Sequence, residues 1–319
     1  MRAIFLLVSI VVVGGCGGGN GGAADADADS DADTDSDTDA DSDVDCPADA
    51  DLVGVWGVRA RLGVTITERP DAIVHLCPSP QQATATLFLR LDVTSQDGTN
   101  VVQTLNVCDV RFPTISGRAT PCDQDGEDVP VEIALGDGLA ALIPTIDIPG
   151  TGTLEPGGDG CLEYRPTRAV VTLGTTFDDD RAALPEWTDG CETTPAECVD
   201  GFAQLEDDDA DAELGVTLTA TSDLLDGEAY VAFRTAPEMT GHVIEADTLV
   251  GEVDPILEYS IVDSDIELSG LPLDTYLVIQ SLPTIDPDAA TSSFTALRST
   301  VIGGDDCAAI VAAENAFDI

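Results

Sequence analysis

The sequence predicts an all-β body, an antiparallel sandwich or barrel that is disulfide-stapled. The first observation is apolar alternation with period two: "TLFLRLDVT" places Leu87, Leu89, Leu91 and Val93 on one face of a strand. The second is the short spacing of turn signals such as "QDGTN" and "LLDGEA" between such runs. The third is an even set of eight cysteines in the body. Helix is expected only in "DCAAIVAAENAF" near the C-terminus.

Residues 1–15 have the pattern of a signal peptide. One positive charge at Arg2 precedes an apolar run from Ala3 to Val13. Such a run is too short to span the hydrocarbon core of a bilayer as a mature helix, about 30 Å thick, but it suits the apolar region of a secretory signal. We therefore expect an exported protein.

The residues Val13-Gly14-Gly15-Cys16 resemble the lipobox of bacterial lipoproteins. The resemblance covers only the first sixteen residues. It implies cleavage before Cys16, acylation of the Cys16 sulfur and amine, and attachment to a membrane through these acyl chains. In this family an Asp directly after the lipidated cysteine favours retention at the inner membrane. Because Gly17 stands there, the expected location is the bacterial outer membrane, with the body on the surface or on the periplasmic face.

Residues 16–45 are expected to be the lipid anchor and a disordered, Asp-rich tether. The segment 17–45 contains eleven Asp and no basic residue, so it has little to bury and repels itself. Fully extended, it reaches about 95 Å at about 3.3 Å per residue. The tether would hold the body away from the membrane.

The body divides by composition into a first β half (46–155), a Cys-bearing connection (156–211) and a second β half (212–319). Three short strings recur in the same order, of which Gly63–Thr67 and Gly215–Thr219 are the clearest pair. An internal duplication of two β halves would leave such echoes, although strands and turns also repeat by chance. The halves could close one barrel together or form two domains.

Nine cysteines include Cys16, and the other eight are even in number. In an oxidising compartment this predicts up to four disulfides, whose connectivity sequence leaves open. The loop "GCETTPAEC" is short enough to join Cys191 to Cys198 directly. The disulfide candidates are Cys46, Cys77, Cys108, Cys122, Cys161, Cys191, Cys198 and Cys307.

Charge restricts the partners. The chain carries 61 acidic residues against 12 basic ones, and every basic residue is Arg. Nucleic acid is excluded as a partner because phosphate contacts need clustered Arg or Lys. The absence of Lys also excludes Walker-type phosphate loops, Schiff bases and Ser-Lys dyads. His75 and His242 lie among apolar strand residues and are expected to be structural, so no catalytic residue is predicted.

Two acidic loops offer oxygen ligands at alternating positions, the arrangement that suits Ca²⁺. The loop "CDQDGEDVPVEI" offers three Asp, and "EDDDADAELGVTL" offers Asp207, Asp209, Asp211 and Glu213 directly before a strand. The second loop is similar to the Asp-rich loops of calcium-stabilised extracellular modules, but it lacks their turn glycine. Solvated loops are the alternative. The candidate ligands are Asp123, Asp125, Asp128, Asp207, Asp209, Asp211 and Glu213.

The string Gly54-Val55-Trp56 on the first strand resembles the Gly-x-Trp mark of lipocalins. The resemblance covers three residues and implies a barrel that holds one apolar ligand. Packing of Trp56 in an ordinary core is the alternative, and it is the one we expect.

Together these observations predict a membrane-anchored lipoprotein with a non-catalytic binding or structural role. Its protein or small-ligand partner is not identified, and no cofactor is expected unless the acidic loops bind calcium. Two alternatives stay open: a carboxylate-dependent extracellular hydrolase and a barrel-type carrier of an apolar ligand.

Overall fold

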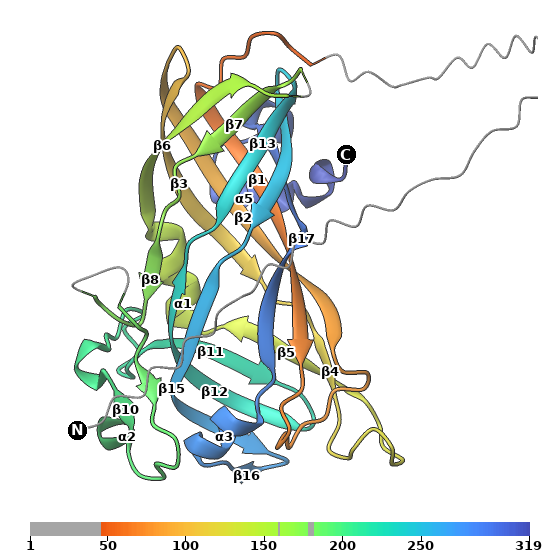
Figure 1. The fold of residues 1–319 in the computed structure, drawn as a ribbon, viewed down its shortest axis with the longest axis vertical. Helices are drawn as coiled ribbons and strands as arrows, with labels where there is room; N and C mark the ends of the chain where they lie inside the picture. The colour runs from red at the N-terminus through yellow and green to blue at the C-terminus, as the bar shows by residue number, and fades with distance from the viewer. Residues whose placement is uncertain (1–45, 159, 178–181) are drawn as a thin grey trace, which may run out of the picture. The chain divides into compact units, whose positions relative to one another are not determined.

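Eight strands close into an antiparallel barrel in the computed structural model, which describes residues 46–158, 160–177 and 182–319 (Figure 1). Strands make up 53% of the described residues and helices 14%. The predicted all-β, disulfide-stapled fold class is therefore confirmed.

Each barrel strand lies beside the barrel strand that follows it in the chain, so the barrel is of the up-and-down type. The last strand, β17, pairs with the first, β1, and closes the barrel. The barrel strands are β1 (Gly54–Thr67), β2 (Gln81–Asp97), β3 (Asn100–Arg111), β6 (Asp147–Pro156), β7 (Leu162–Pro166), β13 (Glu238–Glu245), β14 (Thr248–Asp254) and β17 (Thr284–Arg298).

Three excursions of the chain between barrel strands build a second antiparallel sheet. The first excursion supplies two strands, the second three and the third two. The strands of this second sheet are β4 (Ile115–Gly117), β5 (Val129–Leu135), β8 (Val171–Leu173), β11 (Val216–Thr221), β12 (Leu225–Thr235), β15 (Leu257–Leu268) and β16 (Leu271–Pro272). A small separate pair joins β9 (Glu186–Trp187) to β10 (Val199–Asp200).

The helices of the described residues are short. They are α1 (Asp137–Leu142), α2 (Pro195–Cys198), α3 (Thr275–Ser281), α4 (Ser299–Ile302) and α5 (Cys307–Ala312), with 3-10 turns η1 (Ile143–Thr145), η2 (Phe202–Gln204) and η3 (Glu314–Phe317). None of those in the described ranges has the length and hydrophobicity that a membrane-spanning helix requires.

Strand β1 contributes to two hydrophobic clusters. Its first half places Trp56 in the cluster inside the barrel. Its second half places Val64 and Ile66 in a cluster with residues of the second sheet and of α3. The register with β17 shifts between Arg61 and Gly63, where the strand passes from one cluster to the other. Figure 1 shows the lower ends of β1 and β17 reaching β4 and β5.

The outer face of β2 is covered by the C-terminal segment. Phe88 is fully buried there, and its ring meets that of Phe317 edge to face with centroids 6.5 Å apart. Arg59 donates a hydrogen bond of 2.9 Å to the Phe317 carbonyl oxygen. The predicted C-terminal helix is thus present as α5, and its role is to cover the barrel wall.

All eight predicted disulfide cysteines are paired, and Cys191 is joined to Cys198 as the sequence predicts. The other bonds join distant elements: Cys108 of β3 holds Cys307 of α5, and Cys46 holds Cys161 just before β7. The four bonds are Cys46–Cys161, Cys77–Cys122, Cys108–Cys307 and Cys191–Cys198.

The described residues from Cys46 onward belong to one compact unit. The barrel takes strands from all three predicted segments, because β7 comes from 156–211. Of the echoed strings, Gly63–Thr67 lies in the barrel and Gly215–Thr219 runs into the second sheet. The duplication and the segment boundaries stay predictions. The signal peptide, Cys16 and the tether lie outside the described residues.

Candidate functional site

Three acidic side chains meet in the loop before β11. One carboxylate oxygen from each of Asp207, Asp209 and Asp211 lies within 4.8 Å of the others. Asp209 is 7% exposed, whereas Asp207 and Asp211 face solvent. The cluster is therefore closed on one side and open to water on the other.

Backbone hydrogen bonds shape this loop. The Asp207 carboxylate accepts bonds of 3.1 Å from the Asp211 and Ala212 N–H groups. The Asp211 carboxylate accepts one of 2.9 Å from the Glu213 N–H. Ala210 and Ala212 have positive φ angles of 58° and 79°, which alanine adopts rarely and only where the surroundings enforce it. The local bonds and the turn conformation hold the loop in one shape.

Asp209 is the buried member of the cluster. Its Oδ2 accepts a 2.9 Å hydrogen bond from the Thr217 N–H, but its Oδ1 has no hydrogen-bond partner among the described residues. Burial raises the pKa of Asp209, and the negative charges of Asp211 and Asp207 raise it further. The backbone of α1 lies close by, since a Cβ at Gly138 would come within 2.3 Å of the Asp209 carbonyl oxygen.

The ends of the loop are attached to the strand region around β8. The Asp208 carboxylate accepts a 2.7 Å bond from the Gly174 N–H. Glu206 N–H donates to the Gly174 carbonyl at 3.2 Å, and Gly215 N–H donates to the Glu206 carbonyl at 2.9 Å. The loop thus lies between the end of β8, the start of β11 and α1.

The structure brings only part of the predicted calcium ligands together. Within the described ranges, Asp123, Asp125 and Asp128 do not form a group of ligand atoms comparable to the cluster before β11. Asp128 instead accepts a 2.6 Å hydrogen bond from Arg118, which lowers the pKa of its carboxyl group. Glu213, likewise predicted, is not a member of the cluster.

His75 has a structural setting. Its Nδ1 lies 2.8 Å from the Glu68 Oε1, and the second Glu68 oxygen accepts a 2.7 Å bond from the Leu76 N–H. The backbone of His75 also pairs with that of Arg118. Glu68 was missed by sequence reasoning, because nothing in the pattern of "ITERPDAIVHL" links it to a residue seven positions later.

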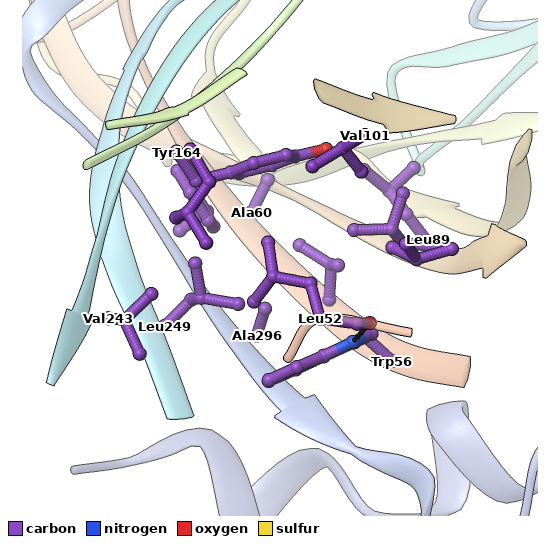
Figure 2. Close-up of a cluster of buried hydrophobic side chains, with 14 of the residues drawn as sticks. Leu52, Trp56, Ala60, Leu89, Val101, Tyr164, Val243, Leu249 and Ala296 are labelled. Atoms are coloured by element: carbon purple, nitrogen blue, oxygen red, sulfur yellow. Dashed lines mark hydrogen bonds between the residues drawn. The ribbon is translucent and has the colours of Figure 1, made fainter. Parts of the chain in front are cut away.

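Side chains fill the interior of the barrel (Figure 2). Phe294 of β17 lies against Gly251 and Gly241, whose missing side chains leave room for its ring. Tyr164 of β7, opposite Gly241, is 3% exposed, and its hydroxyl donates to Gln103. The space that a carrier would use for a ligand is occupied by this packing.

Trp56 lies in the barrel core, as expected. Its ring is fully buried, and its Nε1 donates a 2.8 Å hydrogen bond to the Leu52 carbonyl oxygen. The Arg298 guanidinium carbon lies 4.4 Å from the ring centroid, within the range of a cation–π contact. The hydrogen bond satisfies the N–H group of the ring, and the cation–π contact covers a ring face, so both partners come from the protein itself.

An open groove of about 290 Å³ lies at the surface beside β12 and β15. Glu186 and Glu258 contribute carboxylates to it, together with Arg234 and Tyr259. Glu258 is already ion-paired with Arg234. This pairing gives one of the two carboxylates a structural contact.

This chain matches no protein-family model, no curated protein and no solved structure. The class of its function therefore has to be argued from its own residues.

Proposed function

We propose that this protein is a lipoprotein of the bacterial outer membrane, with a non-catalytic binding or structural role. The observation that carries the proposal is the distribution of its cysteines. Eight of the nine form four disulfides in the body, and the ninth is Cys16, which follows the apolar run of the expected signal peptide after two glycines. The residue left over stands where a lipoprotein carries its acyl chains.

Four disulfides in one chain support export, because disulfides persist in oxidising compartments and are rare in the cytosol. Two of the four close loops of 115 and 199 residues, so they are integral to the fold. Lipidation at Cys16 would then hold the exported body at a membrane, since two or more acyl chains give stable anchoring.

The packing of the body supports a binding or structural role. The barrel interior is occupied by buried side chains, and the histidines sit in structural contacts or in a barrel strand. A partner would therefore meet the outer surface. The whole chain has a formal net charge of -49, which favours cations and basic partners and repels anionic ones.

Expression of the full chain in a diderm bacterium tests the anchor. We expect membrane fractions to contain the wild type, with an N-terminal peptide whose mass shows acylated Cys16. The variant Cys16→Ala should appear in the soluble periplasmic fraction with its four disulfides intact. An unmodified Cys16, or a Cys16→Ala protein that stays with the membrane although its residues 1–15 have been removed, would overturn the proposal.

The choice of membrane has its own test. Gly17→Asp should move the acylated protein to the inner membrane, whereas Gly18→Asp, which adds the same charge one position later, should leave it in the outer membrane. If both variants and the wild type fractionate with the inner membrane, the outer-membrane assignment is wrong while the anchor stands.

A further inference from the structure

The acidic cluster before β11 contains a buried oxygen that the protein itself does not satisfy. Asp209 is more than nine-tenths buried, and its Oδ1 has no hydrogen-bond partner among the described residues. A buried carboxylate oxygen without a donor or a cation is costly, and native structures leave few such atoms unexplained. The carboxylate lies with those of Asp207 and Asp211, so its environment is negative.

No Arg among the described residues neutralises this cluster. The ion pairs of the described arginines are with other acids: those of Arg118 and Arg298, for example, are with Asp128 and Asp247. Three carboxylates within 4.8 Å of one another repel unless a positive charge lies between them. The cluster therefore has no cationic partner among the described residues, and a metal ion from solution would supply one.

The loop presents these oxygens in a fixed arrangement. Its backbone is held by the bonds that Asp207, Asp209 and Asp211 accept from N–H groups of the same loop and of β11. A carboxylate oxygen has more than one lone pair, so a bond from an N–H does not prevent it from binding a cation. An arrangement held in advance loses less entropy when the ligand binds.

We propose that Asp207, Asp209 and Asp211 bind one Ca²⁺. The donors are all oxygens, which favours a hard cation over Zn²⁺, a metal that prefers nitrogen and sulfur. Calcium accepts irregular sets of six to eight oxygens, and the exposed side of Asp207 and Asp211 leaves room for water ligands. Mg²⁺ fits less well, because it requires near-octahedral geometry at shorter distances.

The bound ion would join three parts of the fold. The loop contacts the end of β8 through Gly174, α1 through Gly138 and β11 through Thr217. A cation held by the loop would therefore stabilise the attachment of the long excursion between β7 and β13. With three protein carboxylates, we expect an affinity in the extracellular range, a Kd on the order of 10⁻⁴ M.

The test uses the full-length protein in detergent, freed of divalent ions by chelation and titrated with CaCl2 in a calorimeter. We expect one saturable site in the wild type. Asp209→Asn keeps the shape of the side chain and removes its charge, and it should weaken this site at least tenfold. Asp123→Asn is the matched control, since it removes the same charge from the other acidic loop and should leave the site unchanged.

Thermal unfolding gives a second readout. Calcium at about one hundred times its Kd should raise the Tm of the wild type and of Asp123→Asn by about 5–10 °C. The shift should be absent in Asp209→Asn. If Asp209→Asn does not fold, the exposed Asp211→Asn takes its place, with circular dichroism to verify its fold.

Several results would overturn the proposal: no saturable site in the wild type, equal binding by Asp209→Asn or its substitute, or loss of the site in Asp123→Asn. Weak binding that survives in every variant would be non-specific binding to the chain's many carboxylates and would also refute the site. A titration with MgCl2 that matches the CaCl2 result would refute the choice of calcium. Cys16→Ala should bind calcium like the wild type, so failure of the anchor and failure of this site are distinguishable.

Discussion

The bond between Cys108 and Cys307 should stabilise the protein more than any local cross-link. It closes a loop of 199 residues, and the other three bonds shorten that loop by only about seven residues in the unfolded chain. The bond between Cys191 and Cys198 closes a loop of 7 residues and is the matched comparison. The two double variants, each with both cysteines replaced by Ala, test the effect of loop length.

The entropy of loop closure sets the magnitude. It amounts to about 5 kcal/mol for the long loop and about 2.4 kcal/mol for the short one at 25 °C. The difference of about 3 kcal/mol corresponds to a Tm lower by about 6–12 °C in the Cys108→Ala/Cys307→Ala variant than in the Cys191→Ala/Cys198→Ala variant. Loss of the Cys108–Cys307 bond also loosens the C-terminal segment that covers Phe88, which lowers the Tm of this variant further.

Calorimetry and guanidinium denaturation of both variants, with the wild type beside them, measure this difference. Intact-mass analysis confirms that the remaining three bonds have formed. Equal destabilisation of the two variants, or greater destabilisation of the one that lacks Cys191 and Cys198, would refute the argument from loop length.

Three further predictions concern single residues. Trp56→Ala should lower the free energy of unfolding by about 3–5 kcal/mol, because it removes a fully buried ring from the barrel core; a loss below about 1 kcal/mol in chemical denaturation would contradict the assigned role. Gly251→Ala should lower the free energy of unfolding by about 1–3 kcal/mol or more, since its Cβ would lie 2.1 Å from a backbone oxygen of the neighbouring strand. The control is Gly150→Ala, whose Cβ meets nothing within 4 Å, so its free energy of unfolding should stay within about 0.5 kcal/mol of the wild type. Arg118→Gln should lower the Tm at neutral pH: the folded-state pKa of Asp128 is lowered by its bond to Arg118, so the stabilisation is present above the unfolded-state pKa and disappears as the pH falls through the folded-state value. Tm curves of the wild type and Arg118→Gln that stay parallel down to the lowest pH would contradict this linkage.

Strand periodicity predicted the wall of the barrel but not what covers it. In β2, residues Leu89, Leu91 and Val93 point into the barrel core, as their alternation indicates. Phe88 lies on the opposite face and is nevertheless fully buried, because the segment at Phe317 packs over it. A period-two pattern distinguishes two faces, but the contact between segments more than two hundred residues apart leaves no local signal.

Topology was beyond local patterns for the same reason. The barrel closes through pairing of β1 with β17, and its eight strands are interrupted by excursions that build another sheet. Each strand carries the same kind of alternation whichever sheet it joins. Sequence reasoning therefore left a sandwich and a barrel open, and the structure decides between them through long-range register.

Spacing of acidic residues predicted two candidate loops and could not rank them. What distinguishes them is packing: Asp209 is buried beneath Thr217 and Gly138, while Asp128 is neutralised by Arg118. The turn glycine expected in a calcium loop is absent, and Ala210 takes a left-handed conformation without it. Such a conformation is enforced by tertiary contacts, so residue type alone does not predict it.

The bond between Cys46 and Cys161 determines how the body would respond to mechanical force. A pull on the N-terminal side of the chain reaches Cys46 before β1, and from there it divides between β1 and the connection of β6 to β7. Strand β1 therefore cannot be peeled from its end one hydrogen bond at a time. Rupture from this end would require two distant parts of the barrel wall to yield together.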